Sequence, residues 1–266
     1  MPFNALASAQ ARAFAHGQVK FVYSTSTTCI LTYGNGDLIK INGVWRRIPQ
    51  GGVTITNAGL VAQTLYYCYA YWNGSAVTLE FSTTGRATST AAGNEGVMVK
   101  NGDDSRSLVG MVWVGTGNLF YDRSDLRWVR SWFNDNGVVV SATSAATVST
   151  SSTATAIELD AGSRVYALLW TGEFYAALVH GSGYNNTANA YDYLGVGFAI
   201  YPNGLSLVGS WQYKQTPSST PMGQLSNSWG AVIPNDGSYY FNSMALVSAG
   251  TVTFTYKQTT VTSVRR

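Results

Sequence analysis

The chain has 266 residues, of which only 11% are charged and 13% aromatic, with 28 glycines and a formal net charge of +3. This small, dispersed charge excludes the clustered Lys and Arg surface that nucleic-acid binding requires. No segment reaches the roughly 18 consecutive apolar residues of a membrane-spanning helix, and the first residues lack the basic start and apolar core of a signal peptide. We therefore expect a soluble chain, made in the cytoplasm, that neither binds nucleic acid nor inserts into a membrane.

Residues 1–20 differ from the rest of the chain and predict an N-terminal arm. The stretch 5–15 is rich in alanine, and Arg12 and His16 lie in or beside it. Such a composition permits either a short helix or an extended segment.

Short strand-like runs separated by turn residues fill residues 21–136. Asn-Gly pairs occur at 35–36, 42–43, 73–74 and 101–102, each beside an apolar or aromatic run. Both residue types tolerate the positive φ that tight hairpin turns demand. We therefore predict a β-meander module over residues 21–136. Trp132 is expected in its core.

The composition changes after Gly137. Residues 138–156 are almost entirely Val, Ala, Ser and Thr, which suits either a flexible linker or a first strand. The alternation at 148–150 favours a strand that crosses between modules. About eight longer strands follow, which predicts an antiparallel β-sandwich of the jelly-roll type over residues 137–266, with Trp170 in its core. The expected fold class is thus all-β.

Catalytic and metal-binding patterns are sparse. Cys29 and Cys68 are the only cysteines, too few for a four-ligand metal site, and we expect two buried free thiols. No nucleophile motif precedes His180. Glu158 and Asp160 would share one strand face, but Ile157 and Leu159 mark the opposite face as buried, so the two acids should be solvated. We expect no enzyme activity, no cofactor and no metal.

Two polar segments remain as candidate binding regions. Residues 181–193 predict a long loop between two apolar strands, and residues 212–228 predict a second one. Tyrosine rings can cover the apolar faces of a sugar, while amide and carboxylate groups bond its hydroxyls. An ordinary surface loop or a subunit contact is the alternative interpretation. The candidate ligand-binding residues are Tyr184, Asn185, Asn186, Tyr191, Asp192 and Tyr193.

One part of the sequence carries a family resemblance. The resemblance rests on the spacing of turn residues and aromatic residues in the runs 65–71, 78–85, 96–100, 108–112 and 130–134. This spacing resembles a segment that recurs in virion structural proteins of tailed bacteriophages, of the tail-fibre or head-fibre type. The resemblance implies a location in the virion, other virion proteins as partners, and docking of the arm on a neighbouring subunit.

Three functions remain open at this stage. The first is a fibre or spike component that self-assembles and attaches to the host through a surface glycan. The second is a capsid decoration or tail adaptor protein without a receptor role. The third, which the scarcity of acids disfavours, is a polysaccharide depolymerase. A homotrimer is expected, because the apolar strands at 194–200 and 244–247 offer more apolar surface than one sandwich would readily hide.

Overall fold

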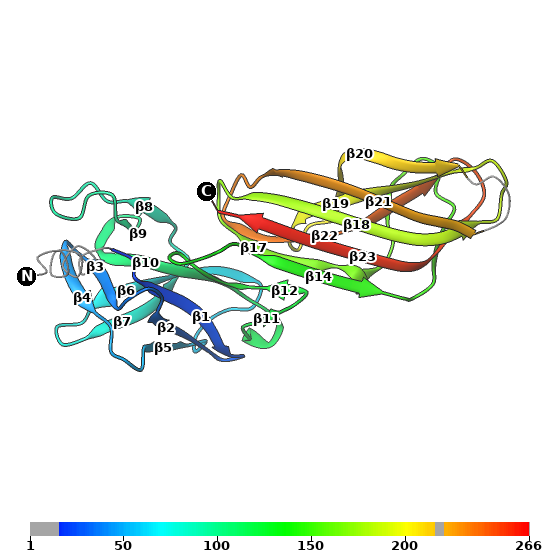
Figure 1. The fold of residues 1–266 in the computed structure, drawn as a ribbon. Helices are drawn as coiled ribbons and strands as arrows, with labels where there is room; N and C mark the ends of the chain where they lie inside the picture. Colours follow the sequence, from blue (N-terminus) through cyan, green and yellow to red (C-terminus); the bar gives the residue numbers. More distant parts are fainter. Residues whose placement is uncertain (1–15, 216–220, 266) are drawn as a thin grey trace, which may run out of the picture. The chain divides into compact units, whose positions relative to one another are not determined.

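The computed structural model describes residues 16–215 and 221–265, so most of the predicted arm lies outside the described residues. The described chain is built of strands, with two short 3-10 turns at Thr116–Asn118 and Ala161–Ser163. None of these residues forms a helix long and apolar enough to cross a membrane. The predicted all-β fold class is confirmed (Figure 1).

The chain divides into two compact units. Unit 1 extends to Asp122 and also contains Trp128–Asp135, whereas unit 2 contains Arg123–Arg127 and Asn136–Arg266. The chain therefore enters unit 2 briefly, returns to unit 1 and leaves it again near the sequence-predicted boundary at residue 136. The short excursion adds a strand to unit 2, since Leu126 and Arg127 pair in parallel with Tyr166 and Ala167.

Unit 1 contains three antiparallel sheets, which form the predicted β-meander module. Their strands, grouped by sheet, are β1 (Val19–Thr25), β2 (Thr28–Tyr33) and β5 (Val53–Thr56); β6 (Thr64–Trp72), β7 (Val77–Ser82), β8 (Arg86–Thr88), β9 (Met98–Lys100), β10 (Asp103–Val114) and β13 (Val129–Ser131); and β3 (Leu38–Ile41) with β4 (Val44–Arg47).

The Asn-Gly pairs of unit 1 do not all act alike. Asn42 and Gly43 both have positive φ and join β3 to β4 in a tight hairpin. The pairs at 73–74 and 101–102 also join paired strands, β6 to β7 and β9 to β10. The hairpin predicted at 35–36 does not form, because β2 pairs with β1 and β5 rather than with β3. That turn is held instead by three backbone N–H groups, at 34–36, which donate to the carbonyl of Gln18.

The core of unit 1 collects the inward side chains of several strands. Cys29 and Cys68 are fully buried in it as free thiols, as predicted. Burial raises the pKa of both thiols well above its ordinary value. Both sulfurs therefore remain protonated and behave as small apolar groups.

The last residues of the predicted arm belong to unit 1. Val19 and Lys20 begin β1, and the Nδ1 of His16 accepts a hydrogen bond from the backbone N–H of Lys40 at 3.0 Å. Its ring lies 4.8 Å from that of Phe133. Burial, assisted by the charge of Lys40, lowers the pKa of His16 to about 4. The prediction that residues up to 20 form a separate arm is therefore wrong for 16–20, since these residues are packed and hydrogen-bonded.

This histidine predicts a pH dependence of stability. Between about pH 6.5 and pH 4 the unfolded chain binds a proton at His16 that the folded chain excludes, so stability falls as the pH falls through this window. We expect a loss of about 2 to 3 kcal/mol over that range. Urea denaturation of the parent and of His16→Gln, which keeps an acceptor but does not titrate, measures it. Parallel pH profiles for the two proteins would refute the assignment.

Unit 2 is a jelly-roll sandwich of eight main strands in two antiparallel sheets (Figure 1). The first sheet has the order β17-β22-β19-β20 and the second β14-β23-β18-β21. The strands are β14 (Val139–Ser144), β17 (Val165–Leu169), β18 (Phe174–Asn185), β19 (Tyr191–Ile200), β20 (Ser206–Gln215), β21 (Pro221–Val232), β22 (Gly237–Val247) and β23 (Val252–Val264); shorter strands are β11 (Asp122–Arg123), β12 (Leu126–Arg127), β15 (Val148–Thr150) and β16 (Ile157–Glu158).

Aromatic rings fill the space between these two sheets. The ring of Phe198 stacks on those of Tyr175 and Tyr239, in each case at 5.2 Å between centroids. Residues 138–156 do not cross between modules, because β14 and β15 both pair with β23 inside unit 2. The apolar strand segments at 194–200 and 244–247 are largely buried by unit 2 itself, so they do not supply the exposed surface from which a trimer was predicted.

Candidate functional site

The first predicted binding loop is mostly strand. β18 continues to Asn185 and β19 begins at Tyr191, so only residues 186–190 connect them. The polar residues at 181–185 pair with β23, and those at 181–184 also with β21, which gives their backbone groups ladder partners. The predicted loop at 212–228 is likewise largely β20 and β21, with 216–220 outside the described residues. Polar composition suggested loops here, but strand alternation continues through both segments.

The six candidate ligand-binding residues do not form one site. Asn185 and Asp192 are fully buried, and the Asn185 amide donates to the Asp192 carboxylate at 2.5 Å. The Oδ1 of Asn186 accepts from the backbone N–H of Thr251 at 2.8 Å. These polar groups therefore hold the end of the sandwich together. Tyr184 lies on β18 of the second sheet, whereas Tyr191 and Tyr193 lie on β19 of the first.

Tyr191 and Tyr193 belong to a group of four rings on β19 and β20, which we call the aromatic cluster: Tyr191, Tyr193, Trp211 and Tyr213. Ring centroids lie 5.6 Å apart for Tyr191 and Tyr213, 5.7 Å for Tyr193 and Tyr213, and 6.1 Å for Tyr193 and Trp211. The strand register places Tyr193 directly opposite Tyr213. Trp211 and Tyr213 were not among the predicted ligand-binding residues, although Tyr213 lies in the predicted loop 212–228. Only the pairing register brings them beside Tyr191 and Tyr193.

A glycine makes room for this cluster. A Cβ at Gly195 would lie 2.2 Å from a methyl carbon of Leu207 and 2.9 Å from the Trp211 ring, so any larger residue would displace both side chains. Tyr213 is 62% exposed and Tyr191 37%. Gln215 pairs with Tyr191 across the two strands, and its amide donates to the Asn189 carbonyl. The Ser248 hydroxyl accepts a hydrogen bond from the Tyr191 backbone N–H. Exposed rings on strands that also carry amide and hydroxyl residues suit a sugar.

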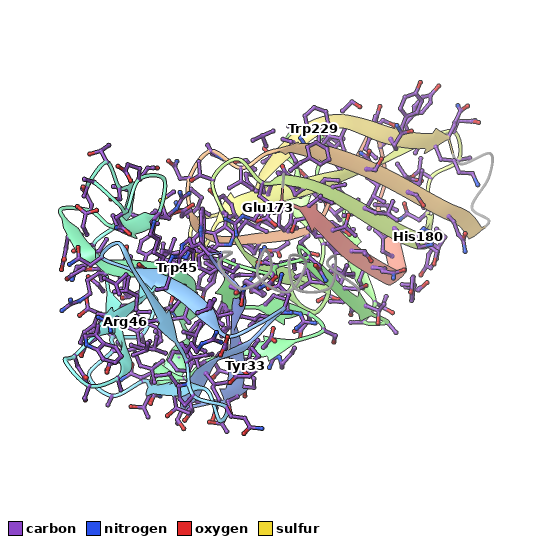
Figure 2. All side chains as sticks on the ribbon, turned by 60° about the vertical axis from the view of Figure 1, so that its left-hand side comes forward. Tyr33, Trp45, Arg46, Glu173, His180 and Trp229 are labelled. Carbon is purple, nitrogen blue, oxygen red and sulfur yellow. The ribbon has the colours of Figure 1, made fainter. Side chains whose placement is uncertain are left out.

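A second surface lies on the outer side of β18, β21 and β23. It contains a hollow of about 500 Å³ lined by Leu178, His180, Ser182, Gln224, Ser226, Tyr256 and Gln258. The His180 Nδ1 lies 2.8 Å from the Ser226 hydroxyl oxygen, and Figure 2 labels His180 on this sheet. None of the seven lining residues has a carboxylate. The backbone groups of β18 bond to its neighbouring strands at this point, which leaves the pair without the orienting acid and oxyanion donors of a hydrolase.

The acids Glu158 and Asp160 are only partly exposed and are ion-paired, so they are not the freely solvated acids of the prediction. Arg164 donates two hydrogen bonds to the Glu158 carboxylate, each at 2.5 Å, and the Nζ of the fully buried Lys257 lies 3.3 Å from Asp160. Burial alone would raise the pKa of Glu158, but the hydrogen bonds from Arg164 and Asn242 lower it overall. The pKa of Asp160 is lowered by comparable bonds. Two paired, ionised acids cannot supply the protonated acid that glycoside hydrolysis needs.

Within 16–215 and 221–265, no three His, Cys, Asp or Glu side chains are grouped as metal ligands would be. The candidate site of this chain is therefore the aromatic cluster.

Comparison with known proteins gives distant structural similarities. No protein-family model and no curated protein matches the chain. Eiger TNF from S. frugiperda is 6% identical over 49% of this chain and 94% of its own, with a TM-score of 0.34. The VP2 subviral particle of infectious bursal disease virus is 11% identical over 95% of this chain and 74% of its own, with a TM-score of 0.33.

A third similarity is to carbohydrate-binding modules of the β-sandwich superfamily, at 10% identity over 94% of this chain and 97% of that one, with a TM-score of 0.21. These TM-scores are too low to carry an argument about function.

Proposed function

We propose that this chain is a structural component of a bacteriophage virion, a fibre or spike part that assembles with copies of itself and binds a host surface glycan. The observation that carries the glycan part is the aromatic cluster, in which the rings of Tyr191 and Tyr213 are exposed and lie 5.6 Å apart. The virion part rests on the resemblance of residues 65–134 to segments of tailed-phage virion proteins. We propose other virion proteins as its further partners.

The proposed role is not catalytic. The candidate acids are engaged in ion pairs with Arg164 and Lys257. The His180 and Ser226 pair has no carboxylate among the residues that line its hollow. These observations disfavour the depolymerase alternative. A decoration or adaptor protein without a receptor role remains the second candidate, and adsorption distinguishes the two.

The glycan proposal predicts an effect of the exposed rings. In the double variant Tyr191→Ala and Tyr213→Ala, each lost ring removes on the order of 1 kcal/mol of stacking. Adsorption of particles that carry the variant should therefore weaken roughly 30-fold. Binding of such particles to host cells, measured as the residual free titre, reports the effect.

Tyr33→Ala provides the matched control. This tyrosine is similarly exposed, at 42%, but lies on β2 of unit 1. We expect it to leave adsorption near the parent level. Normal adsorption of the double variant would favour the decoration or adaptor function, whereas an equal loss with Tyr33→Ala would show that the effect is not specific to the aromatic cluster.

A further inference from the structure

One exposed face of the sandwich carries almost no charge. β14, β18, β21 and β23, which form the second sheet, contain one charged residue between them, Lys257. Its side chain is fully buried and bonds to Asp160 and to the Ala146 carbonyl. The solvent-facing side of these four strands, which we call the uncharged face, thus has no Asp, Glu, Lys or Arg among its described side chains.

The ladder register shows that the uncharged face is continuous. Outward positions alternate along each strand, and they line up across the sheet, so that Val139, Thr262, Ala176 and Gly230 form one row. Several apolar side chains on this face are exposed to solvent: Leu178 is 47% exposed, Val232 57%, Val264 59% and Val139 64%. Ser, Thr, Gln and His side chains lie between them.

This composition is unusual for a surface that faces water. A surface designed for solubility carries about 25 to 35% charged residues, whereas charged residues are depleted at the centre of protein interfaces. In the first sheet the outward side chains of the central strand β22 are covered, since Tyr240 and Met244 are only 5% exposed. In its lack of charge, the uncharged face therefore resembles the centre of a protein interface.

We propose that the uncharged face is the contact surface between copies of this chain. The inference rests on the self-assembly proposed above and assigns it to one sheet. The partner that fits this face is a second copy of the chain. Because the face has no charged side chains, the identical face of a neighbouring copy needs no opposite charges to match it. Hydroxyl and amide groups, as in Thr262, Ser228 and Gln258, both donate and accept, so they are able to pair with an identical surface.

The area of the face is large enough for a stable contact. β18 has twelve residues and so spans about 40 Å, and four strands span about 19 Å, which gives a footprint on the order of 700 Å². A specific interface of standard size buries roughly 800 Å² on each partner.

His180 lies within this face and bonds to Ser226 on the neighbouring strand, so its polar atom is already partly satisfied before a copy docks.

The test introduces one charge on the uncharged face. Thr262 is exposed and lies between β14 and β18 in its row, so Thr262→Arg should fold normally but bury an unpaired charge in every contact. We expect the full chain to be oligomeric at micromolar concentration by analytical ultracentrifugation. We expect the dissociation constant of the variant oligomer to be at least about 100-fold higher than that of the parent.

Thr153→Arg, at an exposed loop position of the same unit, is the matched control and should remain oligomeric. If Thr262→Arg loses its circular dichroism spectrum, Ser228→Arg on β21 makes the same test at another position of the face. An oligomeric parent with equally oligomeric, folded variants would overturn the assignment of the face while leaving self-assembly intact. A monomeric parent would overturn both.

Discussion

Trp170→Ala is expected to lower the free energy of unfolding of unit 2 by about 3 to 5 kcal/mol. The Trp170 side chain is 1% exposed, and the Arg265 guanidinium lies 5.3 Å from the centre of its ring. Truncation leaves a cavity that the paired strands around it cannot close, so the lost burial and the cavity both destabilise the fold. Urea denaturation followed by far-ultraviolet circular dichroism measures the loss, with a lower yield of soluble protein as a second readout.

The control is the other tryptophan that the sequence places in a core. Trp132 is half-buried, and its ring lies 4.8 Å beneath the Arg86 guanidinium. The prediction that it occupies a core is therefore wrong, and Trp132→Ala should cost below about 2 kcal/mol, through the lost cation-π contact and partial burial. An equal loss for the two variants would contradict this difference in burial.

The sequence was sufficient for the fold class because the relevant signals are local. Alternating apolar residues and Asn-Gly turns depend on neighbours along the chain, and hairpins such as that at Asn42 and Gly43 follow directly from backbone conformation. The eight-strand sandwich follows from strand number and turn spacing. The hairpin prediction at 35–36 was wrong because the N–H groups of this turn bond to the Gln18 carbonyl, which lies on a different part of the chain.

The candidate site could be predicted only in part, because it depends on register. Tyr191 and Tyr193 were identified from their position between apolar strands, but Asn185 and Asp192 belong to a buried hydrogen bond that composition does not reveal. Trp211 and Tyr213 join the cluster through pairing across β19 and β20. A pairing one residue out of register would put these rings on the other face of the sheet.

Asp135→Ala should destabilise unit 1 by about 3 to 5 kcal/mol, because it breaks a buried ion pair. The Nε and a terminal nitrogen of Arg130 each lie 2.8 Å from the same Asp135 oxygen. The two side chains are 4% and 9% exposed. Removing the acid leaves the Arg130 guanidinium buried without this counter-charge. Urea denaturation at neutral pH, followed by tryptophan fluorescence, measures the loss.

Two comparisons separate a buried charge from lost packing. Asp37 pairs with Arg47 in the same unit, but Arg47 is 65% exposed, so Asp37→Ala should cost no more than about 1 kcal/mol. The double variant Arg130→Met and Asp135→Ala removes both charges and should regain much of the stability that Asp135→Ala alone loses, because no charge remains to be desolvated. A double variant less stable than Asp135→Ala would instead mean that the aliphatic stem and further bonds of Arg130 stabilise this region, independently of its partner.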